Sequence, residues 1–208
     1  MSTVTQQIIK RIRAKRRGWV FAPKDFLDLG SRAIVDQALL RLTRQGIIRR
    51  LDRGVYDFPK QHAILGTLSP DSKGLARAIA SKAANKVIAS GASAANTLGL
   101  STQVPAKPTF VTNGPTRAKK VAGRTIVLKH AKVPVFDNVS DTANLTLQAL
   151  AHLGKKNIDS LVLQRCANAL TDRDVRNLVA HVDRTSSWMA EIILKIKKAK
   201  VGLIRDEA

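Results

Sequence analysis

The chain has 208 residues, of which 44% are hydrophobic, so it is long enough for one large or two modest domains with real cores and is not a disordered basic tail. Its 36 Lys and Arg outnumber 15 Asp and Glu, and the net charge of +21 favours a polyanionic partner, with nucleic acid ranked well above an anionic membrane. Aromatic residues make up 4% of the chain, too few to favour stacking platforms for single-stranded nucleic acid.

Two helical segments come first in the chain. Val4, Ile8 and Ile12 recur at helical spacing and predict an amphipathic helix. A second, shorter helical segment opens at Pro23 in the stretch PKDFLDL, because Pro suits the first helical position and acids favour the first turns. Gly30 then predicts a tight turn into the next helix.

A longer helix is predicted over residues 31–45. Val35, Leu39 and Leu42 recur at offsets of three and four and mark one buried face. The first residue of this helix is a Ser, a good N-cap, and Gly46 ends the helix, as Gly commonly does. Helix, short helix, turn and longer helix is the order of a helix-turn-helix.

A basic hairpin is predicted directly after this helix. Two short β runs, residues 47–51 and 55–58, flank Asp52, Arg53 and Gly54, and the glycine is expected to adopt a positive φ in the turn. A helix followed by a basic hairpin is the core of a winged helix-turn-helix, whose second helix enters the DNA major groove while the wing lies along phosphates. The plainer alternative is a small α+β domain without DNA contact.

Base-reading residues are expected at the start of the helix over residues 31–45. Arg32 suits a guanine edge and Gln37 suits adenine. The full set expected to face base edges is Ser31, Arg32, Ala33, Asp36 and Gln37. The cations expected to contact phosphate are Lys24, Arg41, Arg44, Arg49, Arg50 and Arg53. Solvated surface without a ligand is the alternative interpretation for each of them.

A domain boundary is predicted near residues 60–71, where KQHAILGTLSPD contains several breakers. The fold class is therefore expected to be α+β. Residues 1–66 are assigned to the winged helix-turn-helix, and residues 67–208 to a mixed α/β domain with a helical C-terminal part. Both parts are basic, with a net charge of +9 in the first and +12 in the second.

The second part mixes helices and strands. Strands are predicted over residues 86–89, 109–112 and 125–129. Helices are predicted over residues 72–84, 91–100, 141–153, 160–170, 172–183 and 187–200. The stretch NGPTRAKKVAG between the last two strands is expected to be a polar, basic loop.

The sequence offers little for catalysis, so we expect a protein that is not an enzyme and needs no metal or cofactor. The four histidines are scattered without metal-ligand spacing, and there is no glycine-rich phosphate loop. Ser93 lacks the second Gly of a nucleophile turn. Cys166 lies in an apolar helical pattern, where an inert buried thiol is expected.

The chain is expected to be cytoplasmic, and nucleoid-associated when bound to DNA. A single cysteine is compatible with a reducing compartment. No run approaches the roughly 18 apolar residues that a membrane span needs. Residues 1–17 lack the apolar region of a signal peptide.

Two motifs, taken in order, resemble a known family. The stretch RLTRQGIIRRLDRGVYDFP, followed by SGASAANTLGLSTQVP and then PTFVTNG, is similar to the AbiEi antitoxins of type IV toxin–antitoxin systems. The resembling positions of the first stretch are Arg41, Leu42, Gly46, Ile48, Leu51, Arg53, Gly54, Tyr56 and Pro59. Those of the second are Gly91, Ser93, Ala94, Ala95, Leu98, Gly99, Leu100, Val104 and Pro105. Residues 136–208 lie outside the resemblance.

This resemblance implies a two-domain antitoxin. Its N-terminal domain would repress its own operon by binding inverted repeats of double-stranded promoter DNA. Its C-terminal domain would counteract a nucleotidyltransferase-like toxin without a stable complex. Within that domain, the basic loop with Arg117, Lys119, Lys120 and Arg124 is a candidate antitoxin surface, because a patch of one charge sign suits an acidic toxin or the toxin's nucleic-acid substrate.

Three alternatives stay open. The first is a winged-helix transcription regulator whose C-terminal domain senses a ligand or dimerises. The second is a nucleic-acid-processing enzyme using residues 67–208, which the lack of a carboxylate or histidine constellation disfavours. The third is an RNA-binding structural protein, although a recognition helix cannot read the deep, narrow major groove of A-form RNA.

Overall fold

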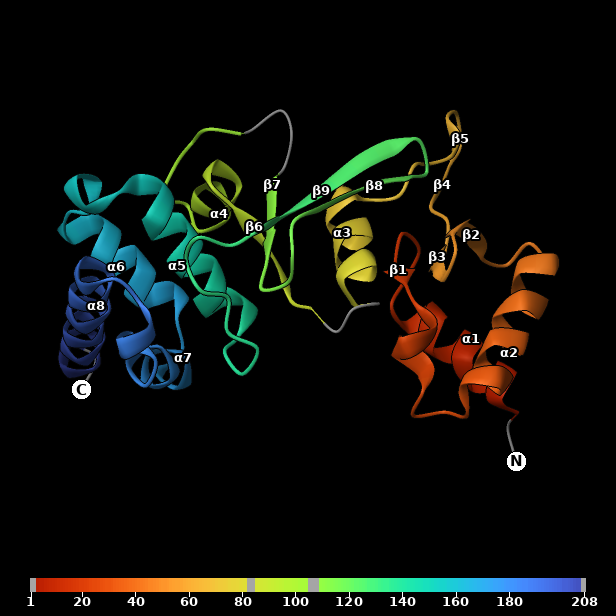
Figure 1. Ribbon diagram of the computed structural model, residues 1–208, viewed down its shortest axis with the longest axis horizontal. Helices are drawn as coiled ribbons and strands as arrows, with labels where there is room; N and C mark the ends of the chain where they lie inside the picture. The colour runs from red at the N-terminus through yellow and green to blue at the C-terminus, as the bar shows by residue number, and fades with distance from the viewer. Residues whose placement is uncertain (1–2, 82–84, 105–108, 207–208) are drawn as a thin grey trace. The chain divides into compact units, whose positions relative to one another are not determined.

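The computed structural model describes residues 3–81, 85–104 and 109–206, and it shows an α+β protein (Figure 1). The chain forms two compact units. Unit 1 comprises residues 1–85 and the separate segment Arg117–Val127, and unit 2 comprises residues 86–116 and 128–208. The predicted domains, residues 1–66 and 67–208, stay a prediction, because compactness does not test which part folds alone.

Unit 1 begins with three helical elements, α1 (Val4–Ala14), η1 (Pro23–Phe26) and α2 (Arg32–Arg44). The two predicted longer helices are thus confirmed. The short segment at Pro23 is a single 3-10 turn. The hydroxyl of Ser31 accepts from the backbone N–H of Ile34, so it caps α2 as expected.

A three-stranded antiparallel sheet packs with these helices. Its strands are β1 (Val20–Phe21), β2 (Arg49–Asp52) and β3 (Val55–Asp57), in the order β1-β3-β2. The predicted hairpin is confirmed, and Gly54 in its turn has a φ of 66°. The elements follow the order that the winged helix-turn-helix prediction requires, and that fold assignment stays a prediction. The largest fully buried side chains of this core are Ile8, Ile12, Phe21, Phe26, Leu39 and Leu42.

The rest of unit 1 includes a small hairpin and a helix. They are β4 (Gln61–His62), β5 (Gly66–Thr67) and α3 (Ser72–Ser81), and the predicted continuation of α3 to residue 84 lies outside the described residues. The segment Arg117–Val127 adds β8 (Arg117–Val121) and the first part of β9 (Arg124–His130).

Residues 113–123 were predicted to form a basic loop. This prediction is wrong for the second half of the stretch, because Arg117–Val121 form the strand β8. It forms the edge of a four-stranded sheet with the order β6-β7-β9-β8. Lysines are typical of edge strands because they discourage pairing with other chains. Because they interrupt the alternation of apolar and polar residues, the strand could not be predicted from hydrophobic periodicity. Ala122 and Gly123 turn the chain between β8 and β9 with φ values of 50° and 75°.

Unit 2 contains the other two strands and a set of helices. β6 (Val87–Ser90) pairs antiparallel with β7 (Thr109–Thr112), and β7 runs parallel to β9. The short helix α4 (Ala92–Thr97) follows β6. The helical C-terminal part consists of α5 (Asp141–Leu153), η2 (Lys155–Asn157), α6 (Ser160–Ala169), α7 (Asp172–Val179), η3 (Val182–Arg184) and α8 (Ser187–Asp206).

Helices α5 to α8 gather around one core at the blue end of the chain (Figure 1). Leu147, Leu150, Leu170 and Leu178 are fully buried in it. Cys166 is buried there too, as expected from its apolar helical pattern. Within the described part of the chain, no helix combines the length and the apolar character that crossing a membrane requires.

Candidate nucleic-acid interface

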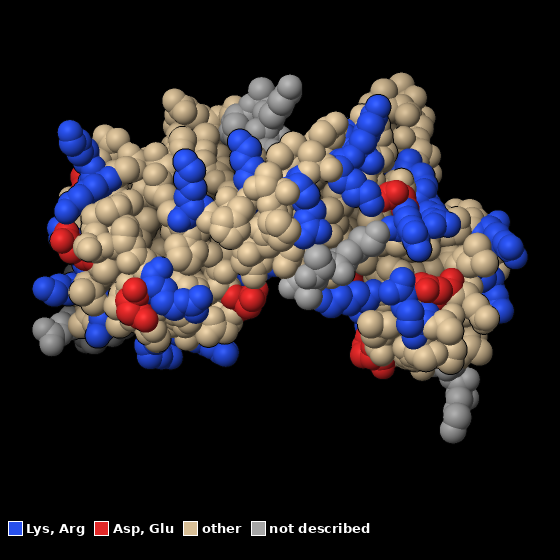
Figure 2. Space-filling view, viewed as in Figure 1, with Lys and Arg blue, Asp and Glu red and all other residues tan. Residues whose placement is uncertain are grey.

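Positive charge is concentrated in unit 1. Its 96 residues carry 21 Lys and Arg against 6 acids, whereas the 112 residues of unit 2 carry 15 against 9. Figure 2 shows Lys and Arg side chains over both units, with acidic side chains in small separate groups. The net charge is therefore +15 on unit 1 and +6 on unit 2, so a polyanion is attracted more strongly to unit 1.

The outer face of α2 carries the predicted base-reading residues. Ser31, Arg32, Ala33 and Gln37 are exposed, and Asp36 is half-buried. Ala33 and Gln37 lie opposite the buried stripe of α2, which packs on the core of unit 1, and Arg32 and Asp36 lie on one flank of that stripe. The start of α2 therefore presents an amide and a small side chain to solvent on the side away from the core, and a guanidinium on one flank of the helix.

Two exposed apolar side chains of α2 were not predicted as site residues: Leu40 lies on the outer face near Gln37, and Ile34 lies on the flank away from Arg32. Ile34 is 48% exposed and Leu40 is 47% exposed. In a helix that enters a major groove, exposed apolar side chains contact the methyl group of thymine. The signal in the sequence was their position off the stripe of Val35, Leu39 and Leu42.

Arg32 and Asp36 form an ion pair one helical turn apart. The Arg32 Nε lies 2.8 Å from the Asp36 Oδ2. This pairing gives Asp36 a role on its own helix, where it holds the guanidinium in place. Arg32 is thus oriented by Asp36, and both side chains stay partly exposed.

The hairpin β2–β3 separates its two neighbouring arginines into different environments. Arg49 makes a bidentate pair with Asp57, with its Nε 3.1 Å and its Nη2 2.6 Å from the two carboxylate oxygens, and it also donates to the carbonyl of Leu68. Asp57 is 1% exposed. The hydrogen bond with Asp57 raises the pKa of Arg49. Arg49 therefore stabilises the fold, whereas Arg50 is exposed and Arg53 lies exposed at the turn.

The acids of this hairpin are both paired with cations. Asp57 binds Arg49, and Asp52 forms an ion pair with Lys119 of β8. Lys119 was predicted to belong to a toxin-facing loop, but the contact attaches it to the predicted DNA-binding hairpin. A phosphate near this hairpin thus meets neutralised acids rather than bare carboxylates.

The remaining predicted phosphate contacts lie on the surface of unit 1. Lys24 is exposed on η1, with its Nζ 3.5 Å from the carbonyl oxygen of Ser81, and Arg41 and Arg44 are exposed in the last turns of α2. Exposed cations that we did not predict as site residues lie in the run KRIRAKRR, residues 10–17, which covers the end of α1 and the residues after it. They are Lys10, Arg13, Lys15, Arg16 and Arg17.

The four cations of the β8–β9 hairpin were predicted as one surface. Arg117 and Lys119 are half-buried, and Lys120 and Arg124 are exposed. The Arg124 Nη1 lies 3.4 Å from the hydroxyl oxygen of Ser72, at the start of α3. The structure thus places all four in unit 1, together with α2 and the hairpin β2–β3.

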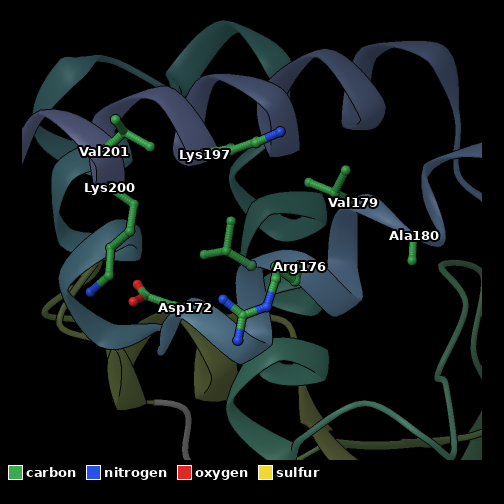
Figure 3. A pocket seen from close by; sticks show the side chains of 8 residues that line it. Asp172, Arg176, Val179, Ala180, Lys197, Lys200 and Val201 are labelled. Carbon is green, nitrogen blue, oxygen red and sulfur yellow. The ribbon is translucent and has the colours of Figure 1, made fainter.

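Unit 2 contains hollows of a different character. A pocket of 420 Å³ between α7 and α8 has an apolar floor and a charged rim (Figure 3). It is lined by Asp172, Val175, Arg176, Val179, Ala180, Lys197, Lys200 and Val201. A second hollow of 330 Å³ is more polar, and its lining includes Lys132, His130, Gln148 and His152.

Two observations concern the metal-binding and nucleophilic groups of the described residues. In that part of the chain, no three His, Cys, Asp or Glu side chains form a cluster able to hold a metal ion. Burial raises the pKa of the Cys166 thiol to about 11. The thiolate, which is the nucleophilic form, is therefore disfavoured at neutral pH.

Residues 7–178 match a protein family described as a family of unknown function, DUF6088. The chain belongs to this family. The match includes both α2 and the β8–β9 hairpin, and it ends in α7. The family description assigns no activity to either. No curated protein matches the chain.

Proposed function

We propose that unit 1 binds duplex DNA as a winged helix-turn-helix, with α2 in the major groove and the hairpin β2–β3 along the phosphate backbone. The observation that carries this proposal is the outer surface of unit 1. There, Gln37 and the oriented Arg32 of α2 belong to the same unit as a hairpin whose acids are paired and whose Arg50 and Arg53 face solvent.

The two kinds of residue perform different tasks in this proposal. Cations such as Arg44, Arg50 and Arg53 supply affinity through phosphate contacts and release of counterions, which is independent of sequence. Arg32 and Gln37 supply specificity, because each bidentate contact with a base edge discriminates by about 1–3 kcal/mol. The exposed Ile34 and Leu40 add contact with thymine methyl groups.

We further propose that the protein is an antitoxin that represses its own operon and counteracts a nucleotidyltransferase-like toxin through unit 2. The motifs similar to AbiEi antitoxins support this step, together with the basic N-terminal part that DNA binding requires. A nucleotidyltransferase gene beside this one is the expected finding. Normal growth when that neighbour is expressed without this protein would contradict the antitoxin role.

A transcription regulator with a ligand-sensing unit 2 is the second candidate. The polar hollow of 330 Å³ favours it, because His130, His152, Lys132 and Gln148 provide hydrogen-bonding groups around a space suited to a small anion or polar metabolite. A ligand that changes operator affinity through this hollow would support the regulator, and His152→Ala would then abolish the response.

Fluorescence anisotropy with the full chain tests DNA binding. Three labelled probes are compared at one salt concentration: a duplex of the gene's own promoter, a duplex of the same composition in shuffled order, and an RNA duplex. We expect the promoter duplex to bind at least ten-fold more tightly than the shuffled duplex, and the RNA duplex to bind no better than the shuffled one. Equal affinity for all three probes would contradict sequence-specific DNA binding.

A further inference from the structure

We propose that the hairpin β8–β9, residues Arg117–Val127, is a second phosphate-binding element of unit 1. The inference rests on the proposed DNA binding of unit 1 and deepens it, since it assigns DNA contacts to a segment far along the chain from α2. It also replaces the prediction that these cations form a toxin-facing surface.

The hairpin is attached to unit 1 by contacts at both of its strands. On β8, Lys119 forms an ion pair with Asp52, the last residue of β2. On β9, Arg124 reaches the hydroxyl of Ser72. Val121 is 2% exposed and Ile126 is 4% exposed, so the hairpin has a buried apolar side. It is therefore held beside the turn of β2–β3.

The alternation along β8 directs its cations to two sides. Arg117 and Lys119 are half-buried and Val121 is buried, whereas Ala118 and Lys120 between them are exposed. Successive side chains of a strand point to opposite faces, so Lys120 lies on the outer face. Arg124 is exposed at the start of β9, just beyond the turn.

The chemistry of the hairpin suits phosphate. Residues 117–127 contain four cations and no acid. Lys119 pairs with Asp52, the acid of the predicted wing turn, so its role here is to neutralise that turn for an anion rather than to bind one itself. Lysines on an edge strand also prevent sheets from pairing, and this role needs no ligand. An experiment must therefore separate the two explanations.

The test uses the full chain with Lys120→Ala and Arg124→Ala combined. Its matched control is Lys195→Ala with Lys198→Ala, which removes the same charge from two exposed positions of α8 in unit 2. Anisotropy of a promoter duplex is measured across salt concentrations. The hairpin variant is expected to flatten the slope of log affinity against log salt by about 1.8, because each lost phosphate contact contributes about 0.9. The control is expected to keep the wild-type slope.

A second pair of variants tests the positioning role of Lys119. Lys119→Ala removes the ion pair that Lys119 forms with Asp52 and is expected to weaken duplex binding. Adding Asp52→Asn is expected to restore most of that loss, because the unneutralised acid is gone. Asp52→Asn in the otherwise wild-type chain is the control, and an equal gain of affinity in both backgrounds would show that Lys119 does not act through Asp52. Circular dichroism of every variant verifies that it is folded.

The outcomes separate this inference from the proposed function. A wild-type chain that binds no duplex overturns the proposed function and this inference with it. A wild-type chain that binds specifically, with a hairpin variant whose salt slope equals that of the control, overturns this inference alone. A hairpin variant that binds DNA normally but no longer protects cells from the toxin returns the surface to the antitoxin role.

Discussion

Arg49 and Arg50 are adjacent in the chain, but we expect their substitution by alanine to change the free energy of unfolding by different amounts. Arg49→Ala leaves the carboxylate of Asp57 buried without its partner, so we expect it to reduce the free energy of unfolding by about 3–5 kcal/mol. Arg50→Ala changes an exposed side chain and is expected to stay within about 0.5 kcal/mol of wild type. Urea unfolding followed by circular dichroism measures both. Equal stabilities would show that the pair with Asp57 does not stabilise the hairpin.

Ala122 adopts a backbone conformation that favours glycine, with a φ of 50°. A left-handed conformation costs a residue with a side chain roughly 1–2 kcal/mol. Ala122→Gly is therefore expected to raise the melting temperature. The control is Ala118→Gly in β8, which is expected to lower it because glycine weakens a strand interior. A lower melting temperature for Ala122→Gly would contradict the turn geometry.

The buried thiol of Cys166 predicts a loss of stability in alkali. Burial raises its pKa from the ordinary value of 9.0 to about 11, so the unfolded chain loses this proton first as pH rises. Its contribution is complete below pH 9.0 and declines between there and about pH 11, with a slope of at most about 1.4 kcal/mol per pH unit. Cys166→Ala is expected to show a shallower decline in urea unfolding at pH 8 to 11. An unchanged slope would contradict burial of the thiol.

At the level of α2, base reading and phosphate binding are expected to separate by position. Gln37→Ala, at the start of the exposed face, should broaden the sequence preference in a selection from randomised duplexes. Arg44→Ala, in the last turn, should weaken all duplexes alike and leave the preference unchanged. The reverse assignment of these two effects would show that α2 lies in the groove in the opposite direction.

Elements with a strong local pattern could be predicted from the sequence. The stripe of Val35, Leu39 and Leu42 and the cap at Ser31 identify α2 because both signals lie within one segment. The strand β1 was missed because it has two residues and exists only through pairing with β3. β8 was missed because charged side chains dominate an edge strand, so hydrophobic alternation is absent.

The candidate site likewise contains features that the sequence predicts and features that it does not. Exposure of Arg32, Gln37 and Arg44 follows from helical periodicity, and the structure agrees. The pairing of Arg49 with Asp57 and of Lys119 with Asp52 depends on contacts between strands. The sequence therefore offered Arg49 as a phosphate ligand and Lys119 as part of another domain, and only the structure connects them to their partners.

For the whole molecule, unit 1 consists of two separate segments of the chain, residues 1–85 and Arg117–Val127. The proposed DNA binding and toxin neutralisation therefore cannot be tested separately by cutting the chain between residues 66 and 67. A fragment of residues 67–208 would remove β2 and leave the β8–β9 hairpin without its partner Asp52. Full-length variants avoid this problem. We expect alanines at Arg32, Gln37 and Arg53 together to abolish operator binding while the chain still neutralises the toxin expressed from an independent promoter. Loss of both activities in a folded triple variant would show that DNA binding and neutralisation share one surface.

The most direct test of DNA binding through α2 compares two affinities of the full chain, one for its own promoter duplex and one for a shuffled duplex. Both are measured for the wild-type chain and for the double variant with Arg32→Ala and Gln37→Ala. The account predicts that the wild-type chain prefers the promoter at least ten-fold and that the double variant binds both duplexes with nearly equal, weaker affinity. A double variant that keeps the wild-type preference would contradict it, because the sequence would then be read by some other part of the molecule.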